Sequence, residues 1–408
     1  MLKVLANSWP LLTGVMLLMV GNGMQSTLLG IRGGIEGFST FEMSVVMSAY
    51  FLGFLGGSQL APSMIRKVGH VRVFSALGSL ISAILVLYPV APDWIAWALM
   101  RVVMGFCFSG VYVTAESWLN DTATNETRGQ TLSLYMIVQM VGIISSQALL
   151  MLGSADGFVL FVIPSVLVSL SFTPILLSIA PAPTFASTKA LSLRRLFRVS
   201  PLGCVGMFLI GGVFSALFGM ASVWGTLVGL GLGQISLFVA AIYLGGMLFQ
   251  YPIGWLSDQV DRRRMIAILS LLGATAIGLG ALNPGFYPLL GVALVGGGTI
   301  NPLYSLLIAH TNDFIEPREM AAASGGMIFI NGLGAITGPL IVGWIMQRLG
   351  PAGFFLFVSV LMLLLAVYAG YRMTRRAAPV PGAYTSLVPT ASAVALEAVL
   401  DKKVPEAA

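Results

Sequence analysis

Twelve apolar stretches, each long enough to cross a lipid bilayer, determine what this chain can fold into. A helix needs about 20 predominantly apolar residues to span the hydrocarbon core, and twelve such helices use most of the 408 residues. Charged residues make up only 9% of the chain, far below the roughly 25% of soluble domains. The predicted stretches are 8–29, 42–61, 73–91, 94–118, 130–152, 158–180, 202–223, 234–255, 265–282, 286–309, 321–346 and 353–372. We therefore expect an all-α, multi-pass membrane protein.

The positions of Lys and Arg predict how the chain is oriented. With the N-terminus inside, 18 of the 21 cations fall in segments on the inner side, while Arg32 and Arg348 fall in outer loops and Arg101 within a span. Because Lys and Arg concentrate in cytoplasmic loops, both termini are expected in the cytoplasm. The same distribution explains the net charge of +6 without a nucleic-acid partner.

An internal repeat at an offset of 192 residues divides the spans six and six. The matches are Tyr112 with Tyr304, Gln139 with Asn331, Arg72 with Arg264, and Asn120 and Asp121 with Asn312 and Asp313. Transporters built from parallel repeats bind substrate near the bilayer midplane, between the two halves. The predicted units are an N-terminal six-helix bundle at 1–180, a cytoplasmic linker at 181–200, a C-terminal six-helix bundle at 201–374 and a weakly ordered cytoplasmic tail at 375–408.

Two short segments resemble signatures of one large family. The segment from Gly254 to Arg264 resembles the cytoplasmic loop signature of the major facilitator superfamily, G-x-x-x-D-R/K-x-G-x-R-R/K, with Asp258 as its acid. In the fourth span, Arg101 to Gly105 resembles the superfamily's R-x-x-Q-G signature, with Met104 in place of the glutamine. The resemblance implies the major facilitator fold, in which two pseudo-symmetric six-helix bundles enclose a substrate cavity.

Three further runs narrow the resemblance. They are Tyr112–Gly129, Gln250–Asp258 and His310–Asp313. They are similar to the YcaD-like group of bacterial inner-membrane proteins in this superfamily, and the resemblance extends from the second helix to about residue 346. It implies a secondary transporter of the bacterial cytoplasmic membrane that works by alternating access.

The first-half copy of the loop signature departs from the pattern, because Arg66 stands where the acid is expected and Pro62 where the glycine is expected. We expect a sign-swapped lock in which Asp258 faces the start of the fifth helix near Arg128, and Arg66 faces Glu316 or Glu319. The alternative is that these are solvated loop charges. The complete predicted lock comprises Arg66, Arg72, Arg128, Asp258, Arg262, Arg264, Glu316 and Glu319.

Two charged side chains fall inside the fourth span. Charges within a span are costly, and they mark ion and proton pathways. Glu116 and Arg101 are therefore the candidates for proton coupling. They lie about 22 Å apart along one helix, so they do not pair directly. The alternatives are a structural ion pair for Glu116 at the inner mouth and carbonyl bonding for Arg101.

Polar residues within the spans are candidates to line the substrate cavity. They are Asn22, Gln25, Arg101, Tyr112, Gln139, Tyr243, Asn301, Tyr304 and Asn331. The resemblance implies that the first, fourth, seventh and tenth helices face this cavity. For any one of these residues, the alternative is a hydrogen bond between helices.

The resemblance and the residues together predict a monomeric secondary transporter of a small organic solute, driven by protons and embedded in the bilayer. A passive facilitator is the alternative within the same class, and a membrane sensor or scaffold is the alternative outside it. No nucleotide-binding lysine loop or cluster of catalytic acids is visible, and two Cys and two His are too few for a His/Cys metal site. No enzymatic activity, cofactor or metal is therefore expected.

Overall fold

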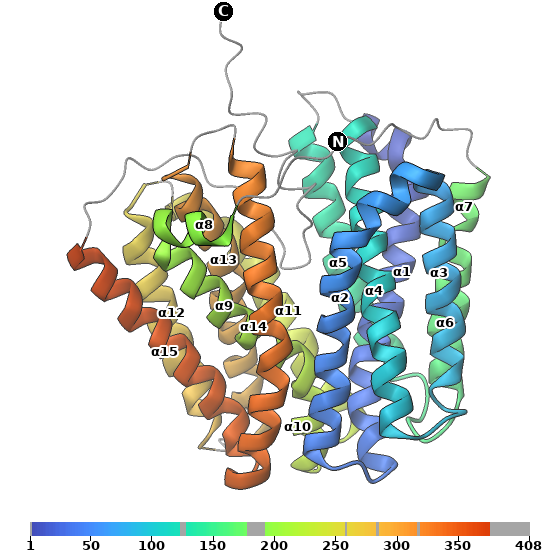
Figure 1. Ribbon diagram of the computed structural model, residues 1–408. Coiled ribbons are helices and arrows are strands. Elements are labelled where there is room, and N and C mark those ends of the chain that lie inside the picture. Colours follow the sequence, from blue (N-terminus) through green and yellow to red (C-terminus); the bar gives the residue numbers. More distant parts are fainter. Residues whose placement is uncertain are drawn as a thin grey trace, which may run out of the picture.

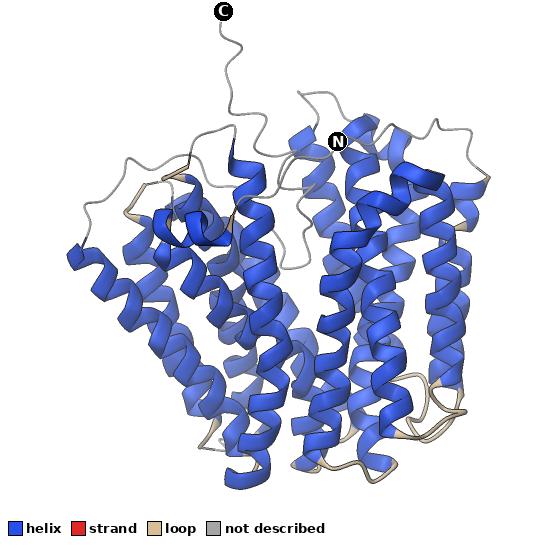
Figure 2. Ribbon diagram, viewed as in Figure 1, coloured by secondary structure: helices blue, strands red, loops and turns tan. Residues whose placement is uncertain are grey.

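The computed structural model describes residues 2–122, 128–177, 192–257, 259–282, 285–315 and 319–375. Within these ranges every regular element is a helix (Figure 2). Twelve of these helical stretches are long and apolar enough to cross a membrane, which confirms the number predicted. The first runs from Ser8 to Ile35, six residues beyond its predicted end, because polar residues at helix ends continue the helix outside the apolar region.

Each half contributes six spans. The first half contains α1 (Leu2–Ile35), α2 (Thr40–Val68), α3 (His70–Leu87), α4 (Trp94–Thr122), α5 (Arg128–Leu150), α6 (Val159–Ser171) and α7 (Thr173–Leu176). The second half contains α9 (Pro201–Ser215), the π-helix η1 (Ala216–Met220), α10 (Ala221–Leu227), α11 (Leu232–Ser257), α12 (Arg262–Gly280), α13 (Phe286–Asn312), α14 (Met320–Leu349) and α15 (Ala352–Arg375). The short helix α8 (Leu193–Val199) precedes the second half. The halves lie side by side, and α1 begins and α15 ends at the upper end in Figure 1.

The internal repeat is visible in the helix boundaries. The starts of α2, α3, α4 and α5 lie 192 residues before the starts of α11, α12, α13 and α14. Close packing repeats as well: the backbone of Tyr50 on α2 lies against Gly105 on α4, and the backbone of Ile242 on α11 lies against Gly297 on α13. Small residues at such crossings let membrane helices approach closely. The two bundles are therefore built on one backbone plan.

The halves meet on their pseudo-twofold axis where α1 ends. A methyl group added to Gly30 would overlap with the Ser222 side chain of α10, and one added to Gly34 would overlap with Thr226. Ser222 and Thr226 are the repeat equivalents of Gly30 and Gly34. Contact between equivalent residues is the mark of a two-fold interface, here formed within one chain.

Two further pairs of helices join the halves at this end. The hydroxyl of Ser48 on α2 donates to the carbonyl of Ile336 on α14 at 2.5 Å. In the repeat-related pair, Met151 beside α5 packs against Gly233 at the start of α11. We call this end, where α1 ends and α2 begins, the closed end, and the opposite end the termini end.

The predicted boundaries of the two bundles, the linker and the tail stay predictions, because much of the linker and tail lies outside the described residues. Residues 181–191 of the predicted linker lie outside the described residues, while its last part forms α8. Of the predicted tail at 375–408, only Arg375, the last residue of α15, lies within the described part.

Candidate functional site

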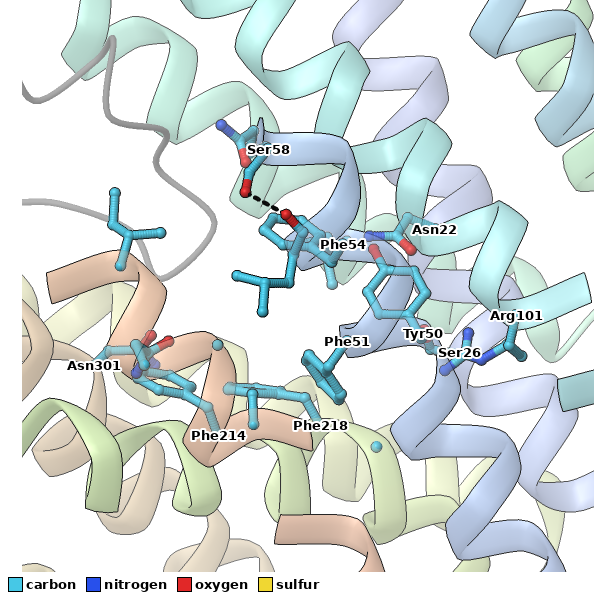
Figure 3. A pocket seen from close by; sticks show the side chains of 18 of the residues that line it. Asn22, Ser26, Tyr50, Phe51, Phe54, Ser58, Arg101, Phe214, Phe218 and Asn301 are labelled. Carbon is cyan, nitrogen blue, oxygen red and sulfur yellow. Dashed lines mark hydrogen bonds between the residues drawn. The ribbon is translucent and has the colours of Figure 1, made fainter. Parts of the chain in front are cut away.

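A cavity of about 140 Å³ lies between the two halves, near the middle of the long helices (Figure 3). Its polar lining consists of Asn22, Ser26, Ser58, Arg101, Gln139, Asn301 and Asn331. Its aromatic lining consists of Tyr50, Phe51, Phe54, Phe214, Phe218 and Tyr243. Small-molecule sites combine mostly apolar walls with a few placed polar groups, and this cavity has that composition.

The structure brings six of the predicted cavity residues together around this space: Asn22, Arg101, Gln139, Tyr243, Asn301 and Asn331. The first, fourth, seventh and tenth spans each contribute to the lining, as the family resemblance implied. The second, fifth, eighth and eleventh spans also contribute, through α2, α5, α11 and α14. The cavity is therefore framed by eight spans rather than four.

Three predicted residues do not line the cavity. Gln25 is fully buried, and its Oε1 accepts a hydrogen bond from Nη1 of Arg101 at 2.9 Å. The Tyr112 hydroxyl accepts from Nδ2 of Asn22 at 3.0 Å. Tyr304 is also fully buried, with its ring 6.2 Å from that of Phe214. Gln25 and Tyr112 thus lie behind the cavity wall and hold Arg101 and Asn22, respectively, in position.

Sequence reasoning missed most of the aromatic lining and the two serines. Ser26 lies one helical turn after Asn22 and therefore shares its face. Phe214 and Phe218 fall on Asn22 and Ser26 when the offset of 192 is applied. Applying the repeat to the predicted Asn22 would have found Phe214, whereas Phe218 required Ser26 to be recognised first.

Arg101 is the only charged residue in the described lining, and it is 2% exposed. Besides its bond to Gln25, its Nη2 lies 3.3 Å from the sulfur of Met47, and its guanidinium lies 4.6 Å from the ring centroid of Tyr50. Its Nε has no hydrogen-bond partner. Within the described residues, no carboxylate forms an ion pair with it. Arg101 therefore presents an uncompensated positive charge beside the cavity.

The amide groups on the opposite wall are partly committed. Nδ2 of Asn301 donates to the Gly297 carbonyl at 3.2 Å, and Nδ2 of Asn331 donates to the Met207 carbonyl at 3.0 Å. Because a backbone carbonyl only accepts, these bonds fix which amide atom is the nitrogen. The side-chain oxygens of both asparagines remain to accept a hydrogen bond from a ligand.

Glu116 lies away from the cavity, on the part of α4 nearer the termini end. It is fully buried, and its Oε1 accepts a hydrogen bond from the Tyr135 hydroxyl at 3.2 Å. One turn earlier on the same helix, Tyr112 contacts Asn22 of the cavity. Polar groups thus follow one another from the cavity toward Glu116.

In this conformation some of the predicted lock residues form ion pairs, and others are exposed. Arg262 forms a buried ion pair with Asp313 at 2.5 Å, and Glu319 pairs with Arg195 of α8 at 2.8 Å. The other three described arginines of the predicted lock, Arg66, Arg72 and Arg264, are exposed. Asp258 and Glu316 lie outside the described residues, as does the side chain of Arg128, the first residue of α5. The pairing of Arg66 with an acid before α14 therefore stays a prediction.

Within the described ranges, no three His, Cys, Asp or Glu side chains gather as a metal site would require.

Comparisons with known proteins agree with this architecture. The chain is 27% identical over 371 residues to the MFS-type transporter YcaD of Escherichia coli O45:K1, covering 87% of this chain and 94% of the relative. The structure is similar to that of the nucleoside transporter NupG, with a TM-score of 0.74 and 14% identity over 90% of this chain and 99% of NupG. A bacterial homologue of the human lysosomal transporter Spinster, in an inward-facing and occupied conformation, gives a TM-score of 0.71 and 16% identity over 97% and 98% of the two chains.

The family model for the Major Facilitator Superfamily matches residues 11–242 and 203–403, two overlapping segments that together span both halves. The members compared above are transporters rather than enzymes. With twelve candidate spans, a two-fold repeat and a central cavity, this chain is a multi-pass membrane transporter of small molecules, and it belongs to the Major Facilitator Superfamily.

Proposed function

We propose that the protein is a proton-coupled secondary transporter that moves a small organic solute across the bacterial cytoplasmic membrane by alternating access. The observation that carries the proposal is the central cavity, which is lined from both halves while the halves are joined at the closed end. A cavity between two related bundles can face one side of the membrane and then the other if the bundles rock.

The distribution of cations supports an orientation for this cycle. Lys and Arg concentrate in the segments at the termini end, and the positive-inside rule then favours a cytoplasmic position for that end. The closed end is then periplasmic, and the conformation is inward-facing. Opening to the outside would separate Gly30 from Ser222, and the predicted lock residues would meet at the cytoplasmic end.

Glu116 is the proposed proton carrier. A fully buried carboxyl group within a span is costly, and such groups mark ion or proton pathways. Its repeat equivalent is Ile308, so the fold does not require an acid at this position. Two tyrosine hydroxyl groups lie along this route. Tyr135 donates a hydrogen bond to Glu116, and Tyr112, one helical turn earlier on α4, contacts Asn22 of the cavity.

The experiment is transport in proteoliposomes with an imposed pH gradient, after a thermal-shift screen has identified a binder. A ligand that binds only the folded state raises the melting temperature. We expect Glu116→Gln to lose gradient-driven accumulation at least tenfold while retaining exchange of substrate across the membrane. Glu42→Gln is the matched control, because glutamine also completes the capping box that Glu42 forms with Ser39.

The outcomes separate the alternatives. Gradient-driven accumulation by Glu116→Gln would remove this residue from coupling. Equilibration without accumulation by the wild-type protein would identify a passive facilitator. Binding without any movement of solute would favour a sensor or scaffold.

A further inference from the structure

We propose that the transported solute is a small organic acid with a single aromatic ring and a hydrogen-bond donor at its far end. This inference rests on the proposed transport function, and it assigns the chemistry of the cavity. The acid group would face Arg101, the ring would lie among the aromatic side chains, and the donor would reach the two asparagines of the second half.

The first argument is electrostatic. Arg101 has no carboxylate partner in the described part of the chain, and its Nε is buried without a hydrogen bond. The ring of Tyr50 lies against one side of the guanidinium, and Arg101 lines the cavity beside Ser26 (Figure 3). Charges interact several times more strongly in such surroundings than in water. An anion would supply the compensation that the protein does not.

The second argument is that the fold does not need this charge. The repeat equivalents of Gln25, Met47, Tyr50 and Arg101 are Leu217, Val239, Ile242 and Ala293. All four equivalents are buried and apolar. The second half therefore packs the same helix crossing, with Gly297 in the place of Gly105, without a polar cluster. A helix-stitching role for Arg101 is thus dispensable in this architecture.

The third argument concerns the opposite wall, which is aromatic. Phe214 and Phe218 are stacked with their ring centroids 5.5 Å apart, and Phe218 lies 4.6 Å from Tyr243. These rings occupy the positions equivalent to Asn22, Ser26 and Phe51 in the first half. Tyr50, Phe51 and Phe54 add aromatic rings from the first half, so rings line the cavity from both sides while its one described charge, Arg101, lies on the first-half wall. Such a lining fits an amphipathic solute with an aromatic ring.

Size and hydrogen bonding limit the solute further. The cavity of about 140 Å³ is below the roughly 300 Å³ where drug-sized pockets begin, which favours one ring over two. One of the two N–H groups on Nδ2 of Asn301 and of Asn331 is committed to a backbone carbonyl, while both side-chain oxygens are left to accept a hydrogen bond. A hydroxyl or amine on the ring would donate to them.

The test is a matched series of probes on the purified full-length protein. Phenylacetate, 4-hydroxyphenylacetate, benzoate and 4-hydroxybenzoate are compared with the corresponding amides and with tyramine, by thermal shift and calorimetry. We expect at least one acid to bind, its amide to bind at least tenfold more weakly, and tyramine not to bind. We expect each hydroxylated acid to bind more tightly than its parent. Equal binding of acid and amide, or no shift by any acid at 10 mM, would overturn the proposal.

Variants then place the bound acid in the cavity. Arg101→Gln should weaken binding of the best acid at least tenfold, while Arg101→Lys, which keeps the charge, should retain most of it. Arg348→Gln removes a cation at the end of α14 and should leave binding unchanged. Undiminished binding by a folded Arg101→Gln protein would contradict the assignment, and should that variant not fold, the acid and amide series on the wild-type protein still decides.

Failure of this inference is distinguishable from failure of the transport function. An acid that binds through Arg101 but does not cross proteoliposome membranes would contradict transport and leave the assignment of the site intact. A neutral ring compound that is transported regardless of Arg101 would contradict the assignment and leave transport intact.

Discussion

The two halves share a backbone plan but differ in what they bury. In the first half the crossing of α2 and α4 encloses Arg101 with Gln25 and Tyr50, and α4 also buries Glu116. In the second half the equivalent positions are apolar, and the cavity lining combines three aromatic rings with the uncharged Asn301 and Asn331. The repeat therefore preserves packing, while the charges buried inside the spans beside and beyond the cavity, Arg101 and Glu116, lie in the first half.

This asymmetry indicates which buried polar groups the structure requires. A position that is polar in one half and apolar in the other is free of a structural requirement, because the second half shows how to pack without it. By this criterion Arg101 and Glu116 are available for function. The ion pair of Arg262 and Asp313 is different, because it joins the start of α12 to the end of α13.

The largest expected effect, a loss of folded protein, comes from adding a second charge in the other half. Ala293→Arg places a guanidinium at the repeat equivalent of Arg101, where Gln25 and Tyr50 are replaced by Leu217 and Ile242. An arginine near a helix centre costs on the order of 3 kcal/mol or more on insertion. We expect folded protein to disappear from membranes, measured as monodisperse yield after extraction. Leu282→Arg, at a position 75% exposed, should retain wild-type yield.

Giving the first half the apolar residues of the second should weaken ligand binding without lowering the stability of the fold. The variant that combines Gln25→Leu, Met47→Val, Tyr50→Ile and Arg101→Ala gives the first half the residues of the second. Replacing a buried charged cluster is often neutral or stabilising when the apolar residues pack well, and the second half packs these four residues at the same helix crossing. We expect a melting temperature no lower than that of the wild type and at least a tenfold loss of organic-acid binding. A variant that aggregates or melts far earlier would show that the cluster is structural.

Much of the fold could be predicted because its determinants are local in sequence. Span length, cation placement and the repeat offset gave twelve helices in two related groups, and the structure has twelve candidate spans. The helix α8 and the π-helix η1 were not anticipated. A seven-residue helix in a Pro/Ser-rich linker has a weak apolar pattern, and a π-helix depends on packing by neighbouring helices rather than on propensity.

The cavity was predictable only in part. Six polar candidates line it, because polar residues inside spans avoid lipid and gather in the interior. Sequence alone could not separate Asn22, which lines the cavity, from Gln25, which lies behind it, since the two are almost one helical turn apart. Likewise Arg195 was not expected to hold Glu319, because their contact depends on the docking of α8 beside α14.

A smaller effect is expected from obstructing the contact between the halves. Gly30→Val would introduce atoms into the space of the Ser222 side chain, so the halves could not join at the closed end. We expect the outward-facing conformation to gain population and transport to fall. The measurement is labelling of a cysteine introduced at Ser26, in the cavity, by a membrane-impermeant reagent from each side. Gly370→Ala, where no atom lies within 4 Å, is the control, and unchanged labelling in Gly30→Val would contradict the inward-facing assignment.

The smallest effect concerns the helix starts that follow the two loop signatures. Asp261 caps α12 by accepting from the backbone of Arg263, whereas its repeat equivalent Gly69 precedes α3 without a side-chain cap. The side-chain hydrogen bond from Arg263 holds the pKa of Asp261 below its ordinary value. A carboxyl group whose folded-state pKa is depressed stabilises the folded state above its unfolded pKa, about 3.9, and loses that effect as the pH falls through the folded pKa.

Asp261→Ala should therefore lower the free energy of unfolding by about 1 kcal/mol at pH 7, the usual value of a helix N-cap, and by less at pH 3. Asp261→Asn keeps a capping oxygen and loses only the charge, so its loss should be smaller than that of alanine. Melting temperatures of the three proteins across this pH range provide the measurement. A difference between wild type and Asp261→Asn that does not shrink toward pH 3 would mean that the charge of Asp261 is not what stabilises the start of α12. The second half would then owe its capped helix to hydrogen bonding alone, and the contrast with Gly69 would be one of geometry rather than of charge.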